Sequence, residues 1–331
     1  MLNPAVRVLW RGPATVQLEL GNRAVLVDGV DSACLRRLTT AGRAGRPPES
    51  GEELVGTDAL AVSGYLWPGC PDEDDLRLAA PRPRLGAELG ALSTRFGERA
   101  AEMLQARRHY AVAVHGSGRV AGHLAALLAA AGIGRVHVTD DGDTQLQYAV
   151  PGGVRPGDEG RHYAAAVTDA VLAAAPEADP TPLPSNERPD LVVLAVDEPI
   201  DPERSAALHA RDWSHLVVRL GSDHGVVGPL VIPGLTSCLR CADLHRVDRD
   251  PAWHALAVQL SVASRRGGAS DVALATVIAG VAALQALAYL DGGQPNTIEK
   301  TIELHLPDWR LRRRSWPPHP GCDCGAEPRP R

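Results

Sequence analysis

The sequence lacks an excess of basic residues. Lys and Arg together number 34 against 40 Asp and Glu, which gives a formal net charge of -6. A general nucleic-acid binder needs surplus positive charge to displace counterions from phosphates, so this balance excludes that role for the protein as a whole. The first residues also lack a charged stretch followed by an apolar one. We therefore expect no secretory signal and a cytoplasmic location.

Long stretches without charge are also scarce, and residues 272–290 form the conspicuous one. Alanine dominates this run, Thr276, Gly280 and Gln285 interrupt it, and no aromatic or basic belts flank it. A membrane span would carry such belts. We expect instead a helix buried on all sides, or one in a dimer interface, and no association with a membrane.

Cysteine is limited to six residues, but four of them form two close pairs. Two residues separate Cys238 from Cys241, and one separates Cys322 from Cys324. Four thiolates in this pattern suit tetrahedral zinc and leave no open position for water, so the predicted zinc is structural. The alternatives are two disulfides, which the cytoplasm disfavours, and free buried thiols.

The first 90 residues show a period of two that is typical of antiparallel strands. Apolar residues alternate over 6–10 and 16–20 and continue at 24–27, with Gly-Pro and Gly-Asn turn signals between them. Helices are expected from residue 31 and over 52–66. Three strands and two helices make a small winged-helix-like α+β module, which a Pro- and Asp-rich linker follows.

The remaining residues, 91–331, predict an α/β domain with a Rossmann-like, mostly parallel sheet. One helix over 85–107 leads into it. Apolar runs predict strands at 110–114, 135–139, 191–196 and 215–220, with helices between them. The first of these helices, 119–131, carries its leucines along one face and stops at Gly132.

A glycine motif lies between the first of these strands and its helix. In His115-Gly-Ser-Gly118, Gly116 gives the tight turn and Gly118 lets backbone approach a phosphate at the helix N-terminus. Asp140 ends the next strand, where an acidic side chain can accept hydrogen bonds from a ribose. The alternative is that both glycines only permit close packing of helix and strand.

Three segments carry a resemblance to a known family. Residues 110–141 look like the nucleotide-binding start of ThiF/MoeB/HesA proteins, relatives of the ubiquitin-activating enzymes, and residues 228–241 resemble the segment leading into their first zinc pair. The ending His319-Pro-Gly-Cys-Asp-Cys324 resembles the ThiF-like partners of YcaO cyclodehydratases in thiazole/oxazole-modified peptide biosynthesis. Residues 1–90 are similar to the PqqD-like peptide-binding element of such proteins. The resemblance implies a homodimer, and it makes Asp197 the acidic residue that helps hold magnesium.

The sequence departs from the adenylating pattern of this family at two places. Adenylating members carry an Asn-x-x-Arg after the ribose-binding Asp and then a Gly-x-x-Lys, and both cations contact ATP. Here residues 141–148 contain no Arg, and the second motif reads Gly160-Arg-His-Tyr163. Without these cations on a transferring phosphate, we expect no adenylation and no catalytic residue, unless Arg155 or Arg161 substitutes. The same departures argue against bound ATP and magnesium.

The predicted function is that of a non-catalytic partner protein. The first module would bind the leader of a precursor peptide by strand addition, with Arg23, Arg36 and Arg37 attracting acidic leader residues. The second domain would dock a YcaO-type cyclodehydratase. The alternatives are an enzyme that adenylates the C-terminus of a peptide or sulfur carrier, and a DNA-binding regulator, which the acidic balance disfavours.

Two features near the C-terminus leave their roles open. Residues 309–316 place four arginines between two tryptophans, which indicates a partner-facing strand or an ordinary surface strand. His319 precedes the second cysteine pair and is a candidate donor of a hydrogen bond to a thiolate.

Overall fold

The structure, a computed structural model, describes residues 2, 6–30, 65, 83–97, 99–184, 186–196, 200–263 and 270–327, with the side chains of 83 and 261–263 left out. Contacts divide the chain into two compact units, Met1–Ala106 and Arg107–Arg331. The sequence placed the change of pattern near residue 90, whereas the contacts divide the chain inside a helix that ends at Arg107. Each unit is described by itself.

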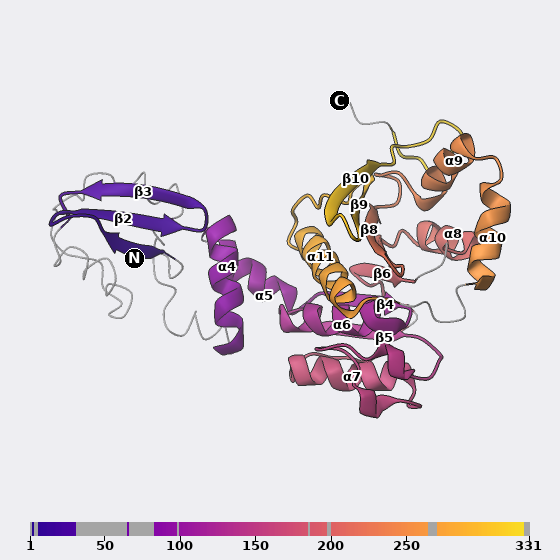
Figure 1. Cartoon of the computed structure of the whole chain (residues 1–331), viewed down its shortest axis with the longest axis horizontal. Coiled ribbons are helices and arrows are strands. Elements are labelled where there is room, and N and C mark those ends of the chain that lie inside the picture. The colour runs from indigo at the N-terminus through magenta and orange to yellow at the C-terminus, as the bar shows by residue number, and fades with distance from the viewer. Residues whose placement is uncertain are drawn as a thin grey trace. The chain divides into compact units, whose positions relative to one another are not determined.

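The first unit contains a three-stranded antiparallel sheet in the order β1-β2-β3 (Figure 1). Its strands are β1 (Arg7–Trp10), β2 (Thr15–Leu20) and β3 (Arg23–Asp28). Alternate residues of β2 are buried, as the period of two predicts. The three predicted strands are confirmed. Of the segment 31–66, in which helices were predicted, only Tyr65 is described, so the winged-helix-like and PqqD-like module stays a prediction.

Helices follow the sheet. A 3₁₀ turn, η1 (Pro83–Leu85), leads into α4 (Gly86–Phe96) and then α5 (Arg99–Arg107). The prediction of one continuous helix over 85–107 was wrong. Gly97 adopts a φ of 58°, a left-handed conformation that ends α4.

The second unit is built on a seven-stranded sheet in the order β10-β9-β8-β7-β6-β4-β5 (Figure 1). Its parallel strands are β4 (Ala111–His115), β5 (Arg135–Thr139), β6 (Leu191–Ala195) and β7 (His215–Leu220). Its antiparallel strands are β8 (His224–Val231), β9 (Lys300–His305) and β10 (Arg310–Ser315). The four parallel strands confirm the Rossmann-like prediction. The antiparallel extension was not predicted as part of the sheet.

Helices cover both faces of this sheet (Figure 1). One face packs against α6 (Gly118–Ala130), α7 (Tyr163–Ala174) and α11 (Val272–Leu290). The other face packs against α8 (Pro202–Ala210) and α9 (Leu239–Arg249), and α10 (Trp253–Ala263) contacts α9. Two 3₁₀ turns, η2 (Leu146–Tyr148) and η3 (Pro156–Asp158), lie in the connection between β5 and α7.

The apolar helix α11 belongs to the core of the second unit. It is long and apolar enough to cross a membrane by length and composition. It buries a stripe from Leu274 to Leu290 against α6 and the sheet, while Val277 and Leu284 on its other face are exposed. The expectation of burial on all sides is therefore wrong within a single chain. A homodimer interface over this face stays a prediction.

Candidate functional site

The glycine loop lies at the carboxyl ends of the parallel strands, where ligands bind in open α/β sheets. Gly116 follows β4 with a φ of 122°, and an added Cβ there would collide with the carbonyl oxygen of Ala195 at the end of β6. Gly118 starts α6 with a φ of 90° and has nothing within 4 Å of an added Cβ. Close packing therefore explains Gly116, whereas Gly118 faces open space at a helix N-terminus.

This difference predicts unequal effects of alanine at the two positions. Gly116→Ala adds a steric collision to left-handed strain and should lower the free energy of unfolding by about 3 kcal/mol or more, whereas Gly118→Ala adds only the strain, about 1 kcal/mol. Urea unfolding of both variants measures the two losses. Equal losses would contradict the assignment of Gly116 to packing.

Of the two acidic residues predicted to accompany the glycine loop, Asp140 and Asp197, the structure describes only Asp140. Asp140 follows β5, beside the loop, because the Gly116 N–H donates to the carbonyl of Thr139 over 3.2 Å. The Asp140 carboxylate accepts a hydrogen bond from the N–H of Gly142 over 2.8 Å. Gly116, Gly118 and Asp140 thus meet at one edge of the sheet. Asp197 lies outside the described residues.

Tyr163 closes onto the start of α6. Its hydroxyl donates to the carbonyl of Gly118 over 2.7 Å and accepts from the N–H of Gly122 over 2.9 Å. The hydroxyl therefore lies against the first turn of α6 and bonds to both of these backbone groups. Tyr163 is fully buried, its ring meets that of Tyr148 edge-on, and burial raises its pKa. A neutral tyrosine therefore occupies the position of the Lys in the adenylating motif.

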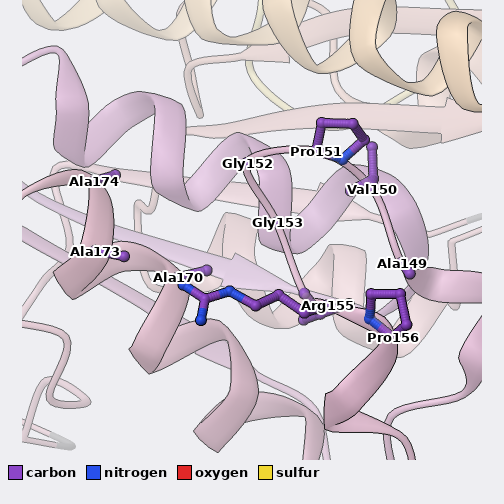
Figure 2. A pocket seen from close by; sticks show the side chains of 11 residues that line it. Ala149, Val150, Pro151, Gly152, Gly153, Arg155, Pro156, Ala170, Ala173 and Ala174 are labelled. Atoms are coloured by element: carbon purple, nitrogen blue, oxygen red, sulfur yellow. The ribbon is translucent and has the colours of Figure 1, made fainter.

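The two arginines considered as substitutes have other surroundings. Arg161 pairs with Asp158 over 2.6 Å and with Asp169 over 2.8 Å. Arg155 lines an apolar cavity of about 600 Å³ between residues 149–156 and α7. Figure 2 shows its side chain extending from this loop toward Ala170. Arg161 is therefore neutralised locally, and Arg155 is directed toward α7.

Two residues of the loop were missed by sequence reasoning. Arg119 is a cation directly after Gly118, and its guanidinium donates to the carbonyls of Gln147 and Ser270. His115 ends β4, and burial lowers its pKa to about 4, so its ring is neutral at physiological pH. The position of Arg119 beside the glycines was a signal for it, but only the structure gives its carbonyl partners.

The four predicted cysteines converge into one cluster. Their sulfur atoms all lie within 4.8 Å of one another, with separations of 3.6 Å for Cys238 to Cys322 and for Cys241 to Cys324, and 3.9 Å for Cys238 to Cys241. A disulfide needs about 2.05 Å. Four sulfurs about 2.3 Å from a tetrahedral zinc lie about 3.8 Å apart. The cluster therefore fits a structural metal site, and the disulfide alternative does not fit.

The fold favours a thiolate at Cys241, whereas the hydrogen bond with Cys241 raises the pKa of Cys238 and burial raises the pKa of Cys322. Cys238 is the N-cap of α9, and Cys241 lies in its first turn, where free N–H groups and the helix dipole stabilise negative charge. The hydrogen bond with Cys238 lowers the pKa of Cys241, and the backbone of His319 contributes a further hydrogen bond. The His319 ring, predicted as the donor, instead meets the carboxylate of Asp248 at 2.9 Å. The backbone of His319, rather than its ring, supports the cluster.

Of the three arginines predicted to contact a leader, the structure describes Arg23. It starts β3, and its guanidinium donates to the carbonyl of Thr94 over 3.1 Å and lies 5.8 Å from the centre of the Tyr65 ring. Arg36 and Arg37 lie outside the described residues.

The fold and the cysteine cluster define a Rossmann-type α/β protein with a metal-binding motif. Residues 91–326 match the ThiF family, and the chain belongs to this family. A search among curated proteins finds no match.

Solved structures of similar fold extend over both units. E. coli MccB with AMPCPP and MccA is 16% identical with a TM-score of 0.71, and 99% of each chain is covered. MccB with ATP is 16% identical with a TM-score of 0.70, covering 98% of this chain and 99% of that one. PaaA is 16% identical with a TM-score of 0.65, covering 94% of this chain and 98% of that one. These likenesses show the fold.

Proposed function

We propose that this ThiF-family protein binds the leader of a ribosomally synthesised precursor peptide and presents it to a YcaO-type cyclodehydratase for azoline formation, with no catalysis of its own. The observation that carries the non-catalytic part is the Tyr163 bridge across Gly118 and Gly122. A lysine there could neutralise a phosphate, whereas a buried phenol cannot. The likeness to MccB, whose structures include MccA, supports a bound partner of that kind.

The leader would bind to the first unit. β3 is an edge strand of the described sheet, so it offers backbone groups to an extended peptide. Arg23 at its start would meet acidic residues of the leader, and the predicted contacts of Arg36 and Arg37 belong to the same proposal. The second unit would dock the cyclodehydratase.

Zinc in the cysteine cluster would have a structural role in this proposal. Cys238, Cys241, Cys322 and Cys324 would hold it, and no ligand position would remain for water. The metal would fix the chain after β10 to the start of α9. It would take no part in chemistry.

Calorimetric titration tests the proposal. We expect micromolar binding of the cognate leader peptide, no heat with ATP plus magnesium, and no ATP–pyrophosphate exchange. Arg23→Glu should weaken leader binding about tenfold, because it reverses a charge at the proposed edge. Arg7→Glu, an exposed change on the opposite edge strand β1, is the matched control and should bind normally. Normal binding by Arg23→Glu would contradict the proposed leader site.

A second candidate function is adenylation of a peptide or sulfur-carrier C-terminus. The observation that favours it is the likeness to MccB, which has been solved with ATP. In that case ATP would bind at Gly116, Gly118 and Asp140, and the titration would show ATP heat with pyrophosphate exchange. Exchange that Gly118→Ala abolishes in a folded protein would establish this function and overturn the non-catalytic one.

A further inference from the structure

Strand β10 forms one edge of the seven-stranded sheet. Within the described residues it pairs with β9 on one side and with no strand on the other. All six of its residues are exposed. It carries Arg310, Arg312, Arg313 and Arg314, and the adjoining Trp309 and the strand residue Leu311 are 62% and 64% exposed.

The pairing with β9 determines which backbone groups of β10 face outward. The N–H of Trp316 donates to the carbonyl of Glu299, so position 316 bonds toward β9. Hydrogen bonding alternates along an antiparallel strand, so 314, 312 and 310 also bond toward β9. The N–H and C=O groups of Leu311, Arg313 and Ser315 therefore point away from the sheet. They are the groups that an added strand would meet.

The arginines of β10 outnumber the acids beside them. Arg312 pairs with Asp308 over 2.7 Å, and Arg314 lies 3.4 Å from Glu303. The side chains of Arg310 and Arg313 form no hydrogen bond or ion pair with any residue that the structure describes. The edge therefore has two arginines without an ion pair among the described residues, one on each face, since neighbouring side chains of a strand alternate.

More positive charge gathers where β10 ends. The ring of Trp316 is buried, and the guanidinium carbons of Arg246, Arg249 and Arg314 lie 4.6, 5.2 and 5.7 Å from its centre. Arg246 is paired with Asp243 over 2.7 Å. Arg249 is exposed. The face that carries Arg310, Arg312 and Arg314 thus continues into a second group of arginines.

We propose that the outer edge of β10 binds an acidic, extended segment of a partner protein as an eighth strand. Carboxylates at alternate positions would meet Arg310, Arg312 and Arg314 on one face, and an apolar residue on the other face would meet Leu311. A second copy of this chain does not fit, because two β10 strands would bring arginines against arginines. Arginine alone would protect an edge from pairing, but exposed Trp309 and Leu311 beside it suit binding. This site is separate from the proposed leader site and goes beyond that proposal.

A synthetic peptide tests this site on the full-length, zinc-loaded protein. The probe is a fluorescein-labelled nine-residue peptide with Glu at alternate positions and Thr or Val between them. Its twin carries the same glutamates with Pro between them, which cannot pair as a strand. We expect fluorescence anisotropy to show saturable binding of the first peptide that weakens with salt, and binding of the twin weaker by about tenfold or more.

Charge reversal locates the binding. The Arg310→Glu and Arg313→Glu double variant should bind the peptide about tenfold or more weakly. The matched control, Arg108→Glu with Arg188→Glu, changes the net charge equally at exposed positions away from β10 and should bind within about twofold of the parent. Thermal melting checks that all variants are folded.

Three results would each overturn the proposal. They are equal binding of both peptides, unchanged binding by the β10 variant, and self-association through β10 in place of peptide binding. None of them bears on leader binding, since the leader titration uses a different strand and different variants.

Discussion

Replacing Cys241 with serine should abolish stoichiometric zinc binding and lower the free energy of unfolding by about 3–5 kcal/mol. Cys241 is fully buried in a core cluster that also contains Val192, Leu194 and Val217 from the centre of the sheet. Structural zinc contributes roughly 10–16 kcal/mol of apparent binding free energy, of which three remaining thiolates and a serine would recover a part. Removal of zinc from the parent protein by a chelator should also lower its melting temperature.

The measurement combines a zinc determination per chain with urea unfolding, with and without EDTA. Cys70→Ser is the control, because Cys70 is outside the two cysteine pairs, and it should keep one zinc per chain. A Cys241→Ser variant that retains one zinc, or a parent whose melting temperature EDTA leaves unchanged, would contradict the metal site. Residual zinc well below one per chain would support it.

Replacing Arg107 with methionine should cost a similar amount, about 3–5 kcal/mol, because it leaves a buried carboxylate unpaired. Arg107 binds both oxygens of Asp291, over 2.8 and 2.6 Å, and also donates to the carbonyl of Ala131 over 2.9 Å. The two side chains are 0% and 3% exposed. Asp291 follows the last residue of α11, where the helix dipole disfavours a negative charge. The ionised Asp291 carboxylate therefore depends on Arg107 for stabilisation.

A double variant separates the cost of the unpaired Asp291 carboxylate from the cost of losing the Arg107 side chain. Adding Asp291→Asn to Arg107→Met removes the unpaired charge and should recover a large part of the loss. The exposed pair Arg188 and Asp212 is the control, and Arg188→Met should cost less than about 1 kcal/mol. Equal losses in the single and double variants would show that the unpaired charge is not the cause. Chemical denaturation measures all four proteins.

The sequence was most informative where one local pattern decides the structure. The strands at 135–139 and 215–220 have the predicted bounds, and the central residues of each are buried. The close spacing within each cysteine pair, and the preference of zinc for four thiolates, predicted that the two pairs form one site. The break at Gly97 was missed, because a glycine within a helical pattern does not by itself end a helix. The place of β8, β9 and β10 depends on pairing between distant segments, which periodicity does not encode.

The sequence predicted the loop of Gly116 and Gly118 beside Asp140, whereas a nucleotide site at this loop stays a prediction. Gly116, Gly118 and Asp140 meet as the strand-turn-helix pattern indicates. The sequence showed that a lysine was missing at position 163, but it did not show that the tyrosine there bonds to Gly118. That contact depends on how α7 packs against α6, and packing partners are set by the whole fold. The same holds for Arg107, whose partner lies 184 positions along the chain.

The tyrosine bridge limits how a nucleotide site could be engineered into this protein. A lysine at position 163 alone would take away the hydroxyl that joins Gly118 to Gly122 and the ring that Tyr148 contacts. A charged amine would then replace a neutral group in a fully buried position. A designer would therefore have to change the packing around position 163, including the contact with Tyr148, together with introducing the lysine.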